Sequence, residues 1–160
     1  MIRFIAAIDK KRGIANDHGI PWDLPSDRQY YRERVAGHVV VMGRGTYNET
    51  RKPVGKLPDY VVTNSTDLLR PGFEPIADPR KFMQQSKEDI WVIGGAGLYN
   101  SIIDLADELY LTLVDQDFDC TKFFPEYSDK FELAGQSEMM TENGINFRYT
   151  TWRRKKQTRS

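Results

Sequence analysis

Cysteine is nearly absent from this sequence: Cys120 is the single one among 160 residues, so no internal disulfide can form. No apolar run approaches the roughly 18 residues that a membrane-spanning helix needs. The sequence also shows no basic and apolar leader, because its first apolar stretch, residues 2–8, is short and runs straight into polar residues. These absences lead us to expect a reduced, cytoplasmic protein that is not embedded in a membrane.

Excess charge of either sign is also absent, since 23 Lys and Arg balance 23 Asp and Glu. A balanced surface argues against general binding to nucleic acid or anionic membranes. The two histidines, His18 and His38, are too isolated for a metal site. The length fits one domain, which we place at residues 1–154, followed by a basic tail at 155–160. No segment resembles an interface, so we expect a monomer.

Short apolar runs rich in β-branched residues predict strands that are covered on both faces, as in a parallel sheet. These runs lie at residues 2–8, 38–42, 60–63, 89–94 and 109–114. Helices are predicted from Pro25 or Ser26 to about Val35, from after Gly43 to before Pro53, from Pro79 with Asp78 as N-cap, and from after the GGAG stretch to about Leu105. Strands that alternate with helices indicate βαβ units.

The C-terminal segments alternate more loosely than the rest of the chain. They flank an Asn143-Gly144 pair, which is a typical hairpin turn. The predicted fold is therefore a single-domain α/β fold. Its mainly parallel central sheet is flanked by about four helices and carries a C-terminal antiparallel hairpin at its edge.

Two of the predicted strands end in glycine and lead into helices. In "VVVMGRGTY", Gly43 allows the chain to turn, Arg44 adds a fixed positive charge, and the free N–H groups of a helix start attract anions. In "WVIGGAGLY", the adjacent Gly94 and Gly95 allow another molecule to approach the backbone, although the spacing is not the Rossmann fingerprint. Each turn alone could be ordinary strand–helix packing. Together they favour an extended phosphate-bearing ligand such as a dinucleotide.

The stretch "GIPWDLPSD" places Asp27 in the first turn of a helix, behind two prolines. Asp27 could simply cap the helix, but Ser26 beside it is already a competent cap. The nearby aromatic residues Trp22, Tyr30 and Tyr31 suggest a wall for a flat ring. A carboxylate beside such a ring could pair with an N–C–NH2 edge through two parallel hydrogen bonds.

The stretches "GIPWDLPSD", "VVMGRGTY", "WVIGGAGLY", "LYLTLVD" and "FFPEY" have the order and spacing of the dihydrofolate reductase family. The chain resembles this family from Met1 to about Arg154. The resemblance implies reduction of 7,8-dihydrofolate to tetrahydrofolate with NADPH, and antifolates as further ligands. It also implies that Asp27 binds the pterin and promotes protonation at N5, that Trp22 orients a water, and that Thr112 hydrogen-bonds the acid.

The same resemblance implies two sets of binding residues. For substrate they are Ile5, Ala6, Asp27, Arg28, Tyr31, Arg32, Thr50, Val54, Leu57, Ile93 and Thr112. For cofactor they are Ala7, Ile14, Ile20, Gly43, Arg44, Gly45, Thr46, Thr63, Asn64, Ile93, Gly94, Gly95, Ala96, Gly97, Leu98 and Tyr99. By the same resemblance, Arg44 meets the 2′-phosphate of NADPH, residues 9–24 form a mobile loop that closes over the nicotinamide, and the Gly94–Gly95 bond is cis.

The sequence departs from the family where an arginine usually clamps the α-carboxylate of the substrate's glutamate. Leu57 stands at that position, and only a gap would bring Lys56 there instead. Arg28, at a position that is usually apolar, shares a helical face with Tyr31 and Arg32. We therefore hypothesise that Arg28 or Arg32 takes over the carboxylate. The alternative is that Arg28 points to water.

A second departure concerns the mobile loop. Cys120 and Thr121 stand where the family frequently has a glycine and an acid that latches this loop. Two competing functions also remain open on the sequence alone. One is reduction of another heterocycle, against which the Asp27 motif argues. The other is a nucleotide-binding module without catalysis, for which the missing arginine is the only support.

Overall fold

The computed structural model describes residues 1–156, so the predicted basic tail lies outside the described residues from position 157 on. The strands are β1 (Ile2–Ile8), β2 (Gly13–Ala15), β3 (Val39–Gly43), β4 (Asp59–Val62), β5 (Phe73–Ile76), β6 (Ile90–Val92), β7 (Glu108–Val114), β8 (Lys122–Phe123), β9 (Phe131–Gln136), β10 (Met140–Glu142) and β11 (Ile145–Arg154). The helices are α1 (Pro25–Val35), α2 (Arg44–Glu49), α3 (Pro79–Gln85) and α4 (Ala96–Ile102), which continues into a short 3-10 turn at Ile103–Leu105. No helix in this part of the chain is long and apolar enough to cross a membrane.

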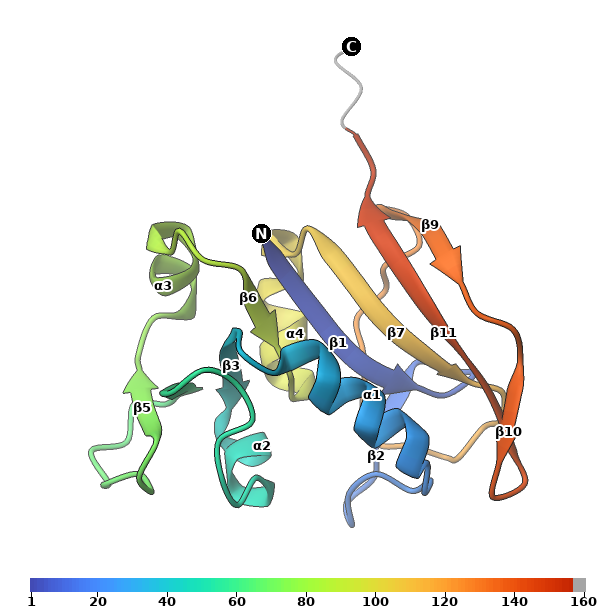
Figure 1. Cartoon of the computed structure of the whole chain (residues 1–160), viewed down its shortest axis with the longest axis horizontal. Coiled ribbons are helices and arrows are strands. Elements are labelled where there is room, and N and C mark those ends of the chain that lie inside the picture. The colour runs from blue at the N-terminus through green and yellow to red at the C-terminus, as the bar shows by residue number, and fades with distance from the viewer. Residues whose placement is uncertain (157–160) are drawn as a thin grey trace.

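The central sheet has the strand order β10-β11-β7-β1-β6-β3-β4-β5, and β9 pairs with β11 (Figure 1). The neighbours from β7 to β5 all run parallel, whereas β11 is antiparallel to β7, β9 and β10. The predicted fold class is confirmed, and so is the hairpin at Asn143-Gly144, which joins β10 to β11. A separate pair of short strands, β2 and β8, links two loops at one end of the sheet.

Strand β5 was not predicted from the sequence. It contains Pro75, which cannot donate a ladder hydrogen bond, and it lies at the edge of the sheet beside β4. Its exposed Glu74 and Pro75 also interrupt the apolar pattern that marks the other parallel strands. The local sequence therefore does not predict this strand, which is recognised only from its pairing with β4.

The helix ends follow local chemistry in one case and not in another. Asp78 caps α3 as predicted, accepting a hydrogen bond from the Lys81 N–H at 3.1 Å, with Pro79 in the first turn. The start of α1 differs, because its N-cap is Leu24 and no side chain caps it locally. The expectation that Ser26 caps α1 is wrong: its hydroxyl instead donates to Glu142 at 2.5 Å.

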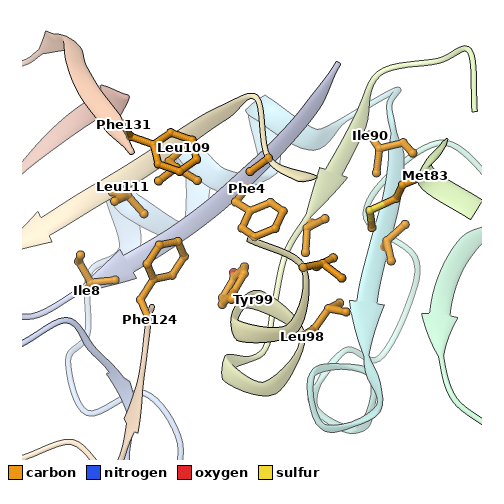
Figure 2. Close-up of a cluster of buried hydrophobic side chains, with 14 of the residues drawn as sticks. Phe4, Ile8, Met83, Ile90, Leu98, Tyr99, Leu109, Leu111, Phe124 and Phe131 are labelled. Carbon is orange, nitrogen blue, oxygen red and sulfur yellow. The ribbon is translucent and has the colours of Figure 1, made fainter. Parts of the chain in front are cut away.

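Both faces of the sheet are buried, as the near-continuous apolar strands predict. Along β3, Val39 and Val41 belong to one core cluster, while Val40 and Met42 belong to the other, because successive side chains point to opposite faces. Figure 1 shows α1 crossing one face and α4 covering the other. Figure 2 shows the α4 side, where Tyr99 lies against aromatic and aliphatic side chains of the sheet.

The segment between α2 and β4 is fixed by a buried carboxylate. Asp59 is fully buried and accepts hydrogen bonds from the N–H groups of Val54 at 2.7 Å and Gly55 at 3.1 Å. Gly55 lies directly against the start of β3, so that a Cβ there would overlap the His38 carbonyl oxygen and come within 2.5 Å of Val40 Cγ2. This close approach holds the segment that carries Val54 against the sheet.

We expect Gly55→Ala to lower the free energy of unfolding by about 1–3 kcal/mol, because the new methyl group must displace backbone or a buried valine. The matched control is Gly135→Ala, since a Cβ at Gly135 meets nothing within 4 Å. Urea denaturation of both variants measures the difference. Equal stability of the two variants would show that the 54–55 segment can move away from β3 at no cost.

Candidate active site

A cavity of about 710 Å³ opens where β1, β6 and β7 end, beneath α1. The carboxyl ends of parallel strands are the usual place for ligands in α/β sheets. The cavity brings together a large part of the predicted site. The predicted residues that line it are Ile5, Ala6, Ala7, Ile14, Ile20, Trp22, Asp27, Arg28, Tyr31, Arg32, Thr46, Thr50, Val54, Ile93, Tyr99 and Thr112.

Asp27 lies at the wall of this cavity, in the first turn of α1. Its Oδ1 accepts a hydrogen bond of 2.6 Å from the Thr112 hydroxyl, which belongs to the interior strand β7. Since α1 has no side-chain cap of its own, the interpretation of Asp27 as a simple helix cap does not hold. The carboxylate instead joins the helix to the sheet at the cavity.

Burial is the main influence on the Asp27 carboxyl and raises its pKa above the usual aspartate range. The Thr112 hydrogen bond and the Arg28 charge lower the pKa, but not enough to cancel the effect of burial. The Glu142 charge acts in the same direction as burial. Asp27 therefore holds a proton to higher pH than an ordinary aspartate, which suits a group that must bind or pass on a proton.

Two of the three predicted aromatic residues face the cavity. Trp22 is buried and packs on Phe118, with ring centroids 5.3 Å apart. Tyr31 also lines the cavity, beside Asp27. Tyr30 does not, because its ring stacks on Tyr149 at 3.9 Å and fixes α1 to β11. The expectation that Tyr30 forms a wall for a flat ring is therefore wrong.

The two glycine turns lie side by side, because β3 and β6 are parallel neighbours. The Gly43 N–H donates to the Gly94 carbonyl at 2.7 Å, and the Gly94–Gly95 bond is cis as predicted. A Cβ on Gly43 would lie 3.5 Å from both Gly94 O and Gly95 N, which is an ordinary contact distance, so packing alone does not require glycine at this position. Helices α2 and α4 begin at these turns, at Arg44 and Ala96.

Arg44 gives these turns a feature that packing does not explain. Its Nη1 is buried and has no hydrogen-bond partner among the described residues, while its guanidinium lies 5.1 Å from the Tyr47 ring centroid. A buried guanidinium nitrogen without a partner is costly, and a phosphate oxygen would satisfy it. The charge of Arg44 and the neighbouring helix starts thus fit a ligand that carries phosphates.

Other predicted residues lie outside the cavity lining. They are Gly43, Arg44, Gly45, Leu57, Thr63, Asn64, Gly94, Gly95, Ala96, Gly97 and Leu98. Most belong to the two glycine turns or to the starts of α2 and α4. Thr63 and Asn64 follow the end of β4. Leu57 is 68% exposed and stands beside Gly72, so it contributes no side chain to the cavity.

The cavity also has lining residues that the sequence did not single out: Asp23, Leu24 and Glu49. Asp23 Oδ1 accepts a 2.6 Å hydrogen bond from Arg28 Nη1, and both side chains are largely exposed. Arg32, one turn further along α1, also lines the cavity. The sequence did carry a signal for Asp23. It is an acidic residue five positions before Arg28, close enough along the chain to pair with that arginine.

The loop at residues 9–24 is joined to the segment before β8 despite the change at Thr121. The Thr121 hydroxyl donates to Asp17 at 3.1 Å, and its N–H donates to the Ala15 carbonyl at 2.9 Å. Asp9 is buried and bridges the same two segments, accepting from the N–H groups of Gly13 at 2.7 Å and Phe118 at 3.0 Å. The loop therefore has polar contacts to this segment without the family's usual acid.

Comparisons with known proteins agree on one family. The sequence model of the family described as dihydrofolate reductase matches residues 1–154. A dihydrofolate reductase of Bacillus subtilis (strain 168) is 32% identical over 148 residues, which cover 91% of this chain and 88% of that protein. One from Staphylococcus aureus is 29% identical over 138 residues, covering 86% of each chain.

The fold has a solved counterpart as well. A structure described as dihydrofolate reductase from Enterococcus faecalis complexed with NADP(H) and RAB-propyl superposes with a TM-score of 0.86. It covers 98% of this chain and 97% of the other, at 22% sequence identity.

The raised pKa of Asp27 has a consequence for stability that needs no ligand. A carboxyl whose folded-state pKa is raised stabilises the fold in acid, and this contribution is lost as pH rises through the folded pKa. We therefore expect Asp27→Asn to gain stability relative to wild type as pH rises from acid to neutral. Urea unfolding across this range measures the difference.

Asp89→Asn is the control with the opposite sign. Hydrogen bonds from Arg3 and the N-terminal amino group lower the pKa of Asp89, so its contribution is present at neutral pH and lost in acid. This variant should lose stability relative to wild type as pH rises. A pH-independent difference for Asp27→Asn would contradict the assignment of a raised pKa.

Proposed function

This chain belongs to the dihydrofolate reductase family, the enzymes that reduce 7,8-dihydrofolate to tetrahydrofolate with NADPH, and we propose that Asp27 carries this chemistry here. The observation that supports the proposal is the partly buried Asp27–Thr112 pair at the wall of the cavity. It offers a carboxyl group where a heterocycle can bind, held by one hydrogen bond and shielded from bulk water.

The carboxylate of Asp27 has acceptor capacity beyond its bond to Thr112. Only Oδ1 is engaged by Thr112, and a carboxylate offers about four acceptor sites. The N3 and 2-amino edge of the pterin presents two parallel donors, which match a carboxylate in the bidentate arrangement. Because burial raises its pKa, Asp27 can also promote protonation at N5. Trp22, buried at the same wall, would orient the water beside it.

NADPH supplies the hydride in this reaction. Arg44 and the starts of α2 and α4 would hold its phosphates, and the partnerless Nη1 of Arg44 supports this placement. Ala7 and Ile14, which line the cavity, would contact the carboxamide of the nicotinamide through their backbones. The loop at 9–24 would close over the bound ring, and Thr121 and Asp9 anchor its base.

We further propose that Arg28 or Arg32 binds the α-carboxylate of the substrate's glutamate. Both arginines line the cavity, and Leu57, at the usual arginine position, does not. Arg28 already holds one carboxylate, that of Asp23. Its guanidinium has five N–H donors, so it can bind a second anion without first releasing Asp23.

A monomeric state, a cytoplasmic location and the absence of nucleic-acid and membrane partners stay predictions. Two other functions would give different assay results. A reductase of another heterocycle would bind NADPH but not turn over dihydrofolate. A binding module without catalysis would bind NADPH but would reduce neither dihydrofolate nor another heterocycle.

We expect Asp27→Asn to lower kcat/KM for dihydrofolate by about 100-fold or more near neutral pH, because the amide cannot promote protonation. Loss of NADPH absorbance with dihydrofolate present measures the rate. NADPH affinity, measured by fluorescence titration, serves as the control and should stay near the wild-type value. If the wild-type protein binds NADPH but does not turn over dihydrofolate, the proposed reductase function is wrong.

We expect Arg28→Leu to raise KM for dihydrofolate about ten- to a hundredfold, the loss of one charge-assisted hydrogen bond, with little change in kcat. Arg80→Leu is the matched control, because Arg80 is also an exposed arginine bonded to an aspartate, Asp104, but lies outside the cavity lining. Arg32→Leu run beside them identifies which arginine acts. If KM is unchanged in both Arg28→Leu and Arg32→Leu, neither residue binds the glutamate.

A further inference from the structure

The turn between β10 and β11 reaches across to the start of α1. The two oxygens of Glu142 contact the same residue: Oε1 accepts from the Ser26 N–H at 3.0 Å, and Oε2 accepts from the Ser26 hydroxyl at 2.5 Å. Asn143, next in the turn, donates from Nδ2 to the Asp23 carbonyl at 3.0 Å. Two successive residues of the turn thus hold the segment that leads into and begins α1.

These contacts supply what the sequence around α1 lacks. A helix start leaves its first N–H groups without intrahelical partners, and a side-chain oxygen at the N-cap normally accepts one of them. Leu24 occupies the N-cap and has no such oxygen, while Pro25 has no N–H. The N–H of Ser26 is therefore the first to need a partner. Glu142 provides it from 116 residues away, with a negative charge that the helix dipole favours.

Two further contacts of α1 with the sheet lie next to each other. Thr112 on β7 and Tyr149 on β11 are directly paired in the antiparallel ladder. Thr112 donates to Asp27, and Tyr149 stacks on Tyr30 one turn later. Both of these contacts involve side chains that are C-terminal to Ser26. Together with the buried side chain of Leu24, the contact of Glu142 with Ser26 holds the backbone just before Asp27.

We propose that Glu142 is a positioning residue for catalysis: it fixes the first turn of α1, so that Asp27 keeps its hydrogen bond to Thr112 and faces the cavity. This inference rests on the proposed role of Asp27. The charge of Glu142 has a second effect, because it helps to raise the pKa of Asp27, in addition to the larger effect of burial. A residue that only stabilised the fold would leave kcat unchanged.

Two variants separate the positioning effect of Glu142 from the effect of its charge. In Glu142→Gln the amide oxygen can still accept from the Ser26 N–H, but the charge is gone. The pKa of Asp27 should then fall, because a like charge near its carboxyl group has been removed. In Glu142→Ala the bond is lost as well, and kcat should fall about three- to tenfold, because a small displacement of an acid is costly in rate.

The titration is read from the carboxyl carbon of Asp27 by 13C NMR in the ligand-free protein, assigned by its loss in Asp27→Asn. The pH dependence of kcat is the second readout. Since the reaction needs a proton at Asp27, the fall in kcat with rising pH should begin at lower pH in Glu142→Gln. Glu132→Gln is the matched control, because it removes the same charge from an exposed side chain on β9 and should change neither readout.

The proposal is overturned if both Glu142 variants titrate at Asp27 and turn over as Glu132→Gln does. If Glu142→Ala does not fold, Glu142→Asp is the second variant: it keeps the charge but shortens the side chain by one CH2 group, so it weakens the contact with Ser26 and should lower kcat. An unchanged kcat in Glu142→Asp would then overturn the proposal. Failure of the proposed function is a different result, in which Asp27→Asn keeps its turnover. In that case the NMR titration still tests whether Glu142 acts on Asp27, although the effect no longer bears on catalysis.

Discussion

The hydrogen bond between Thr112 and Asp27 is the contact on which the site depends, because it joins its two halves. Thr112 belongs to a strand in the interior of the sheet and cannot move without the core. Asp27 belongs to a helix that lies on the sheet surface and packs through few buried residues, of which Val35 is one. The bond makes a carboxylate part of a largely apolar wall. Its raised pKa, its orientation and its closeness to Trp22 and Tyr31 all follow from that placement.

The fold was predictable where local chemistry and burial agree. The strand at 2–8 and the helix that starts at Pro79 follow from an apolar run and from an Asp-Pro start. Strand β5 escaped prediction because a proline and exposed residues break its pattern, and only its partner β4 defines it. The same limit applies to Ser26, whose partner Glu142 lies 116 residues away. Contacts of that separation leave no trace in a local pattern.

The sequence predicted many residues of the site, but it did not predict which way each side chain points. The glycine turns and the Asp27 stretch pointed to a phosphate site and a ring site, and the structure brings them together around one group of strand ends. Periodicity could not tell that Tyr31 faces the cavity while Tyr30 turns to Tyr149, since neighbouring residues of a helix differ by about 100° in direction. Leu57 was placed by its position in the family pattern, but its exposed side chain points away from the cavity lining.

The order of strands in the sheet has a consequence for how the chain is made. Strand β1 is made before its neighbours β6 and β7, so Ile2 cannot pair with Ile90, nor Arg3 with Glu108, until those strands have been made. The nascent chain must carry an apolar, unpaired strand through most of its synthesis. Early contacts can form only among β3, β4 and β5, which are closer in sequence. Because Asp27 and Thr112 are 85 residues apart, the hydrogen bond between them can form only after β7 has been made.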